Sequence, residues 1–381
     1  MTERDAAADE TAGSSTPASY AAAGVDIDAG ERAVELIAPH AKRASRPEVL
    51  GGIGGFSGLF ALKGNYREPV LAAASDGVGT KLAVAQAIDK HDTVGRDLVA
   101  MCVDDLVVCG AEPLFLQDYI AVGKVVPETV AELVGGIAEG CVRAGCALLG
   151  GETAEHPGLM AEGEYDLSAT GVGVVEADEV LGPDNVRAGD VVIAMKSSGL
   201  HSNGYSLARK VLLDWGHMDL GGYVEEFGRT LGEELLEPTR IYTRALLDLV
   251  RSDDVDVHAL SHVTGGGLAA NLARVLPQGT IARVDRASWT PPPIFTLVGE
   301  LGAVPRTDLE RTLNMGIGFV AALPQASVDA AIARSRAAGI DAWVLGEVSD
   351  AATTEPVAGA EVVQGAKGVH GGAVQVVGEH V

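Results

Sequence analysis

Residues 114–155 read LFLQDYIAVGKVVPETVAELVGGIAEGCVRAGCALLGGETAE, and this stretch contains the alternation on which the fold depends. The apolar run Leu114–Val122 predicts a strand. The amphipathic segment Pro127–Ala144 predicts a helix, with a proline just inside its start and Gly145 just beyond its end. The apolar run that follows ends in two glycines and two acids, as a strand or a turn would. Short apolar runs that alternate with longer amphipathic segments indicate an α/β or α+β protein.

The same alternation continues on both sides of this stretch. Further strands are predicted at Val70–Ser75, Tyr165–Val175, Val191–Lys196, Thr280–Val284, Gly316–Leu323 and Ala342–Glu347. Further helices are predicted at Asp28–Lys42, Val94–Gly110, Tyr205–Trp215, Thr239–Arg251, Gly267–Leu276, Pro292–Gly302, Arg306–Leu313 and Ser327–Ala338. The turn-forming cluster Leu181–Arg187 separates two apolar runs, so we place a domain boundary near residue 177.

The 381 residues are expected to form two domains, 20–176 and 177–348, because single cores seldom grow beyond ~250–300 residues. Residues 1–19 lack the basic start and the apolar stretch of a signal peptide, and their composition predicts a disordered tail. Residues 349–381 are rich in alanine, glycine and valine with little periodicity. They predict a loose C-terminal extension.

Composition excludes several classes of protein. A formal charge of −25 argues against a nucleic-acid binder, which needs a basic face, and an apolar fraction of 47% excludes a wholly disordered chain. No window approaches the ~18 apolar residues of a membrane span. The four cysteines, Cys102, Cys109, Cys141 and Cys146, lie in apolar surroundings without a C-x-x-C pair. They predict buried free thiols and a reducing cytoplasm.

Residues 51–58, GGIGGFSG, form the first candidate site. Glycines Gly51, Gly52, Gly54 and Gly55 let the backbone approach a ligand closely or point several amides at an anion. The segment matches neither the Walker pattern nor G-x-G-x-x-G. A flexible surface loop is the alternative interpretation.

Residues 76–81, DGVGTK, directly follow the predicted strand Val70–Ser75. A carboxylate at the end of a strand, followed by glycines and a lysine, suits a metal–triphosphate complex. Asp76 would hold Mg²⁺, Lys81 would neutralise phosphate oxygens, and Gly77 and Thr80 would contact the nucleotide from the same turn. The alternative is a tight turn with an exposed lysine.

Two further sets of carboxylates stand in apolar surroundings. Asp104 and Asp105 are adjacent in the predicted helix Val94–Gly110, which is apolar nearly all round, and an unpaired buried carboxylate is costly. We favour metal ligation for Asp105, with a structural salt bridge as the alternative. Gly151 and Glu152 end the apolar run described above. Glu152 would supply a third carboxylate to Mg²⁺, with a solvated turn as the alternative.

Two histidine-containing segments each open a predicted helix. Residues 197–206, SSGLHSNGYS, place His201, Ser202 and Asn203 at a helix N-terminus, which is a ready anion site. A capping loop would explain the serines and the asparagine but hardly the whole cluster.

The second of these segments is HALSHVTGGG, residues 258–267. Gly265, Gly266 and Gly267 can wrap a phosphate, and His262 can transfer a proton near neutral pH. A structural histidine is the alternative.

In their order along the chain these segments resemble the phosphoribosylformylglycinamidine cyclo-ligase (AIR synthetase) family of purine biosynthesis. The resemblance runs from about Tyr20 to Val348 and is carried by Ala23–Asp26, Arg46–Glu48, Gly51–Phe56, Asp76–Lys81, Asp105–Val108, Gly150–Glu155, His201–Ser206 and Thr264–Gly267. Each motif alone is weak, but the ordered set is specific. Asp104 departs from the family pattern, in which asparagine is common at this position.

The resemblance implies a two-domain PurM-like fold whose N-terminal sheets pair into a barrel at a homodimer interface. It implies ATP- and Mg²⁺-dependent closure of formylglycinamidine ribonucleotide to aminoimidazole ribonucleotide, with ADP and phosphate as further products. On this view Mg²⁺ binds Asp76, Asp105 and Glu152. The arm Gly51–Gly58 closes over the nucleotide, and the helix starts at His201–Asn203 and Gly265–Gly267 contact substrate phosphate or triphosphate. The implied catalytic residues are His262 for proton transfer, with Lys81 and Asp76.

Two alternatives remain open. One is another enzyme of the same fold, such as a thiamine monophosphate kinase or a selenium-activating enzyme, although no reactive cysteine stands near the Gly-rich arm. The other is a non-catalytic ATP-binding subunit, against which the combination of Asp76, Lys81, Asp105, Glu152 and His262 argues.

Overall fold

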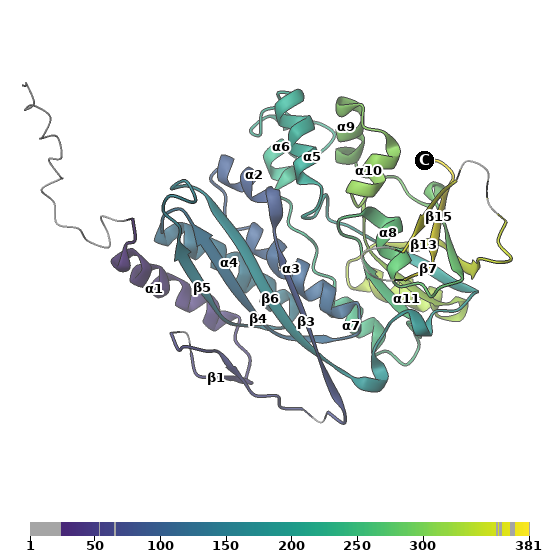
Figure 1. Cartoon of the computed structure of the whole chain (residues 1–381), viewed down its shortest axis with the longest axis horizontal. Coiled ribbons are helices and arrows are strands. Elements are labelled where there is room, and N and C mark those ends of the chain that lie inside the picture. Colours follow the sequence, from purple (N-terminus) through teal and green to yellow (C-terminus); the bar gives the residue numbers. More distant parts are fainter. Residues whose placement is uncertain are drawn as a thin grey trace, which may run out of the picture.

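The computed structural model describes residues 24–52, 54–64, 66–355, 357, 360–365 and 370–380. They form two α/β halves, shown in Figure 1 with the first sheet on the left and the second on the right. The predicted mixed α/β, two-domain architecture is confirmed. The predicted disordered tail, residues 1–19, lies outside the described residues. No described helix is long and apolar enough to cross a membrane.

The first sheet has four strands: β3 (Pro69–Gly77), β4 (Glu112–Val122), β5 (Ala147–Glu155) and β6 (Tyr165–Glu176). Their order is β3-β6-β4-β5, with β4 parallel to β5 and the other pairs antiparallel. Helices α1 (Ile27–Arg43), α3 (Val94–Val107) and α4 (Pro127–Ala144) pack together on one face of this sheet. The α3 helix is buried nearly all round, as its sequence predicts.

The opposite face of the first sheet remains open in the described part of the chain. Leu71 and Tyr119 are 62% and 41% exposed there. The Ser75 and Thr170 hydroxyls form a cross-strand hydrogen bond of 2.6 Å on this face. A small hairpin of β1 (Val49–Leu50) and β2 (Leu59–Phe60) covers one end, where the Phe60 and Phe115 rings lie 5.4 Å apart.

The second sheet has seven strands in the order β10-β12-β7-β13-β11-β15-β14. Their bounds are β7 (Asp190–Lys196), β10 (Ala259–His262), β11 (Thr280–Asp285), β12 (Ile317–Pro324), β13 (Ala342–Asp350), β14 (Glu361–Gln364) and β15 (Ala373–Val377). Helices α7 (Thr243–Val250) and α11 (Val328–Ala337) pack against one face of the sheet. Helix α8 (Gly267–Arg274) packs against the opposite face. The central strand β7 is therefore buried on both faces, which explains its continuous apolar sequence.

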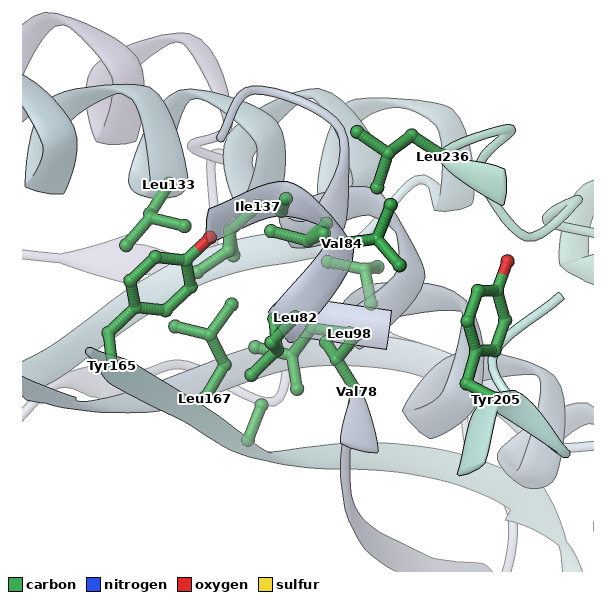
Figure 2. Close-up of a cluster of buried hydrophobic side chains, with 14 of the residues drawn as sticks. Val78, Leu82, Val84, Leu98, Leu133, Ile137, Tyr165, Leu167, Tyr205 and Leu236 are labelled. Carbon is green, nitrogen blue, oxygen red and sulfur yellow. The ribbon is translucent and has the colours of Figure 1, made fainter. Parts of the chain in front are cut away.

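Shorter elements join the two sheets. They are α2 (Leu82–Ala87), α5 (Tyr205–Arg209) with a following π-helical turn (Lys210–Trp215), β8 (Tyr223–Val224), β9 (Arg229–Thr230), α6 (Leu231–Leu235), α9 (Pro293–Gly302) and α10 (Arg306–Thr312). Figure 2 shows that Val78, Leu82 and Leu98 of the first half share one buried cluster with Tyr205 and Leu236 of the second. The two halves are thus joined by a common apolar core.

The chain passes between the sheets from the end of β6 at Glu176 to the start of β7 at Asp190, and the predicted boundary at residue 177 lies in this connection. The prediction of a loose C-terminal extension from residue 349 is wrong. Residues 373–377 form β15, which pairs in parallel with β11, and Val374 and Val376 are buried. Five residues behind a glycine-rich segment are too short for a clear periodic signal, but they complete this sheet.

Candidate functional site

Two of the sequence motifs meet where the halves of the molecule join. The turn after β3 and the loop after β7 lie against each other, and the Thr80 and Ser206 hydroxyls are 3.1 Å apart. The backbone favours glycine in this turn, because Gly79 has φ +75°, a conformation that side chains with a Cβ rarely adopt. The glycine thus allows the chain to turn sharply at the end of β3, beside the loop of the second domain.

Three titratable side chains lie together beside this junction: Asp76, Asp105 and His262. Asp76 lies near the end of β3, Asp105 on α3 and His262 at the end of β10. The His262 Nδ1 donates to Asp105 Oδ1 at 2.9 Å, and its ring stacks on Phe319 with centroids 5.4 Å apart. Asp105 is half-exposed, whereas the imidazole is buried. The acid is therefore the solvent-facing member of the pair.

The charges of this cluster influence one another. Burial raises the pKa of Asp76, and the negative charge of Asp105 raises it further. Burial alone would lower the pKa of His262, but the hydrogen bond to Asp105 and the charges of the surrounding carboxylates outweigh it, so this pKa is raised. The cluster therefore attracts positive charge, either as a proton on the imidazole or as a bound cation.

His201 lies close by but is held as a neutral ring. The Ser198 amide donates to its Nε2 at 3.1 Å, which places the ring proton on Nδ1. Burial lowers the pKa of His201 well below its usual value, and the positive charges of His262 and Lys81 act in the same direction. A neutral His201 ring supplies no positive charge to a phosphate.

The other predicted substrate residues differ in their accessibility. The Ser202 hydroxyl is buried and bonded to Asp97 and Thr239. Asn203 is partly exposed and lies beside Gly265, where an added Cβ would come within 3.2 Å of its Oδ1. Gly265 and Gly266 are also partly exposed, whereas Gly267 is buried at the start of α8. Of these residues, Asn203, Gly265 and Gly266 are the partly exposed ones.

Lys81 does not fit the predicted contact with phosphate. Its ammonium is fully buried and donates to Asp97 Oδ1 at 2.9 Å, to the His201 carbonyl at 3.2 Å and to the Glu237 carbonyl at 2.6 Å. Three acceptors use all three donors of an ammonium group. Lys81 therefore connects the first domain to two segments of the second, which corrects both the predicted contact with phosphate oxygens and the alternative of an exposed lysine.

Two buried acids of α3 make connections that sequence reasoning missed. Asp97 Oδ1 accepts from the Thr239 amide at 2.7 Å in addition to Lys81. Asp104 accepts from the amides of Tyr242 and Thr243, each at 3.0 Å, and so caps the start of α7. Burial raises the pKa of Asp104 to about 7. An acid in an otherwise apolar helix predicts that the carboxylate has a buried hydrogen-bond partner. It does not predict which residue that partner is.

The remaining predicted nucleotide residues lie at a different place. Gly54, Gly55, Gly151 and Glu152 line a pocket of about 550 Å³ between α1, α4 and β5. Gly51 and Gly52 are exposed in the same arm and are not among its lining residues. Val34, Ile37, Val130, Val134 and Leu148 are among the apolar residues of its walls.

Asp118 also lines this pocket and was missed from the sequence. It stands in the apolar strand LFLQDYIAV, and burial raises its pKa to about 7. The carboxyl lies over Gly151, where an added Cβ would come within 2.4 Å of its Oδ1. Gly151 is therefore needed for the close approach of this side chain, whatever else it contacts. A single acid inside an apolar strand was the available signal.

The predicted metal set of Asp76, Asp105 and Glu152 is not assembled within one chain. Register places Gly77 opposite Ser168, Ser168 opposite Tyr119, and Tyr119 opposite Glu152. Three strand spacings of ~4.8 Å separate the two edges by about 14 Å. No three histidine, cysteine or acidic side chains of the described ranges gather as a metal site. Asp76 and Asp105 are neighbours, and Glu152 is remote because β3 and β5 are opposite edge strands.

The fold and both parts of the site define a class of two-domain protein. Residues 64–175 match the model of the AIR synthase related protein N-terminal domain, and residues 187–358 match that of its C-terminal domain. Solved structures share this PurM-like fold at low identity. A thiamine-monophosphate kinase from Stenotrophomonas maltophilia K279a gives a TM-score of 0.61 at 20% identity, covering 92% of this chain and 97% of that one. The hydrogenase maturation protein HypE in complex with ATP gives 0.60 at 19% identity, covering 91% and 93%.

Curated relatives place the chain more narrowly. A phosphoribosylformylglycinamidine cyclo-ligase of Carboxydothermus hydrogenoformans is 53% identical over 331 residues, which are 87% of this chain and 96% of that protein. One of Anaeromyxobacter sp. (strain Fw109-5) is 56% identical over 335 residues, 86% of this chain and 95% of that protein. The chain belongs to the phosphoribosylformylglycinamidine cyclo-ligase family.

Proposed function

We propose that this enzyme closes formylglycinamidine ribonucleotide to 5-aminoimidazole ribonucleotide with consumption of ATP, in purine biosynthesis. An amide oxygen is a poor leaving group. The γ-phosphoryl group of ATP is transferred to that oxygen, with ADP released, and an amidine nitrogen then attacks the activated carbon. The carbon–oxygen bond breaks with loss of phosphate, and the nitrogen loses a proton. The observation that carries the proposal is the Asp76–Asp105–His262 cluster beside the loop His201–Ser206.

His262 and Asp105 are the proposed unit for proton transfer. The carboxylate orients the imidazole through Nδ1 and stabilises its charged form, which is why the pKa of His262 is raised although the ring is buried. An imidazole held in this way accepts the proton that the amidine nitrogen releases. A His262→Ala enzyme with near-normal turnover and intact ATP binding would refute this role.

Asp76 and Asp105 are the proposed Mg²⁺ ligands. Mg²⁺ is commonly held by one or two protein carboxylates together with phosphate oxygens, so a pair of acids is a sufficient protein contribution. Burial raises the pKa of Asp76 and the charge of Asp105 raises it further, and a cation between these groups would offset both effects. The ion would offset the negative charge of the phosphates during transfer.

The nucleotide is proposed to occupy the pocket lined by Gly54, Gly55, Gly151 and Glu152, with the arm 51–58 excluding water as it closes. Because Glu152 and Asp76 lie on opposite edges of one sheet, they can hold one Mg²⁺ ion of the nucleotide complex only if two copies combine. We therefore propose a homodimer in which the open sheet faces pair into a barrel. Four free thiols suit a cytoplasmic enzyme.

The reaction is tested by adding formylglycinamidine ribonucleotide to enzyme, ATP and Mg²⁺. The expected result is ADP release that depends on this substrate, with aminoimidazole ribonucleotide as product. No stimulation above ATP alone would refute the proposed function in favour of another enzyme of this fold or a binding subunit.

The shared site is tested by mixing differently tagged Asp76→Ala and Glu152→Ala chains. Each variant alone should be inactive. A purified heterodimer should regain about half of the wild-type activity, because one of its two sites then contains both intact acids. No recovery in a purified heterodimer would show that the acids act within one chain or separately.

A further inference from the structure

The charges of the pocket beneath α1 restrict which part of a nucleotide can enter it. Its lining includes five acids, Asp26, Glu31, Asp118, Glu152 and Glu155, and none of its described lining residues is a lysine or an arginine. A triphosphate inside would be repelled by this set. The apolar walls suit a flat base, while Gly54 and Gly55 lie on the glycine-rich arm, where backbone amides can approach phosphate. The nucleoside end therefore belongs inside and the phosphates at the arm.

Two of these acids are already used by the fold. Glu155 accepts from the backbone amides of Asp26 and Val125 at 2.8 and 2.7 Å. Asp26 in turn caps α1 by accepting from the Ala29 amide at 3.1 Å. These bonds hold the start of the helix against the end of β5. Of the three remaining acids, Glu31 and Glu152 are exposed, and only Asp118 is partly buried.

Asp118 has no comparable partner among the described residues. Only its own backbone amide donates toward the carboxyl, which lies close to Gly151. The raised pKa of this side chain, about 7, reflects its removal from water. Asp118 is partly exposed and lines the pocket, so a ligand that brings a hydrogen-bond donor to this carboxyl gains affinity.

We infer that Asp118 determines the base specificity of the enzyme by accepting a hydrogen bond from the exocyclic amino group of adenine. The inference rests on the proposed function, because it takes the pocket as the ATP site. Hypoxanthine and guanine carry a carbonyl oxygen where adenine carries this amino group. Above pH 7, where the Asp118 carboxyl is ionised, two acceptors would then face each other without a proton, and the base would be rejected; the comparison is therefore made at pH 8.

A series of ATP analogues tests the inference on the wild-type enzyme. ATP, ITP and N6,N6-dimethyl-ATP are compared in the assay for aminoimidazole ribonucleotide. ITP replaces the amino group with a carbonyl, and the dimethyl analogue removes both donors. We expect each analogue to raise KM at least tenfold. An equal KM for all three would overturn the inference, whereas the absence of product with ATP itself would instead refute the proposed function.

Asp118→Asn provides the reciprocal test. An asparagine amide can donate to the carbonyl of hypoxanthine and accept from its ring N–H, so the preference for ATP over ITP should fall at least tenfold. Glu35→Gln, on the exposed side of α1, removes the same charge and should keep the wild-type preference. An unchanged preference in a folded Asp118→Asn enzyme would overturn the inference. If this variant does not fold, the analogue series decides.

Discussion

At the scale of single residues, the acids of α3 have separate tasks although they lie close together in the sequence. Asp97 binds Lys81 and Thr239, Asp104 caps α7, and Asp105 orients His262. The first two are buried and connect the domains, whereas Asp105 reaches solvent. Burial and the hydrogen-bond donors around each carboxylate therefore distinguish the structural acids, Asp97 and Asp104, from Asp105, the acid of the proposed catalytic cluster.

Replacing Lys81 with methionine should destabilise the protein. The change leaves Asp97 buried without its cation, and breaking such a pair typically costs about 3–5 kcal/mol. Thermal unfolding should show a clear fall in Tm, whereas Lys90→Met removes an exposed pair with Asp92 and should change Tm little. An unchanged Tm together with a raised KM for ATP would instead restore Lys81 as a phosphate ligand.

Asp104 should make stability depend on pH. Its pKa is raised to about 7 in the folded protein, so the folded state binds the proton more tightly than the unfolded state does. The stability that this group contributes is complete below its unfolded pKa of about 4 and is lost as the pH rises through 7.

The corresponding variant is Asp104→Asn, measured by chemical denaturation in EDTA between pH 4 and 8. An asparagine oxygen can still accept from the Tyr242 and Thr243 amides. The variant should lose less stability than wild type over this range, by up to about 1.4 kcal/mol for each unit of the pKa difference. Parallel curves would contradict the raised pKa.

At the scale of elements, the end of the chain completes the second sheet. Strands β14 and β15 lie beyond residue 358, where the match to the C-terminal domain ends. Strand β15 pairs with β11, and the Arg283 Nε donates to the buried Gln375 at 3.3 Å. The core on this side of the sheet includes Val374, Val376 and Leu272 of α8. These strands are therefore part of the domain.

Truncation after residue 358 should lower Tm and expose apolar surface. Removal of β15 uncovers β11 and part of α8, which lose buried valine contacts worth roughly 1.5–3 kcal/mol for each large side chain. Differential scanning calorimetry and dye binding would measure both effects. A chain that lacks residues 1–19 should keep the wild-type Tm if the predicted disorder of that tail is right. Equal Tm values for both truncations would contradict a structural role for β15.

At the scale of the whole molecule, one face of the first sheet is left without a covering layer in the described residues. Leu71 and Tyr119 are exposed on that face, and two acids proposed for one site lie on opposite edges of the same sheet. Both observations support the pairing of two copies. A single chain would leave the Leu71 and Tyr119 side chains of this face in water and the proposed metal site without one of its acids.

Charges placed on the open face should separate the proposed dimer. Leu71→Glu combined with Tyr119→Glu would bury like charges against each other across a two-fold interface, at a cost of several kcal/mol. Light scattering after gel filtration should show a monomer, with helical circular dichroism retained and activity lost. Asp329→Asn, on the exposed start of α11, should leave the mass unchanged. A wild-type monomer with full activity would contradict the dimer.

Much of the element pattern could be predicted because it depends on local periodicity. The predicted helix Pro127–Ala144 has the same bounds in the structure, and Val191–Lys196 differs from its strand by one residue. Short strands were harder to predict from the sequence. Residues 259–262 and 373–377 are too few to show a period, and their pairing partners are distant in the sequence.

The candidate site was predictable only in part. The sequence identified Asp76, Asp105 and His262, whose residue types suit metal binding and proton transfer. It also assigned Lys81 to phosphate, although a buried acid sixteen positions later takes the ammonium. Asp118 was missed because one acid in an apolar strand gives no indication of the pocket above it. Contacts of this kind depend on the packing of α3, α4 and the sheet.

The sequence by itself therefore determined the two α/β halves, the order of their motifs and the family to which the chain belongs. These follow from hydrophobic periodicity, turn-forming residues and ordered motifs, all of which are local along the chain. Only the tertiary structure decided that Asp105 meets His262, that Lys81 is buried and that Glu152 lies away from Asp76. The reason is physical: strand order and helix packing set the distances between residues that are far apart in the sequence, and those distances decide which charges interact.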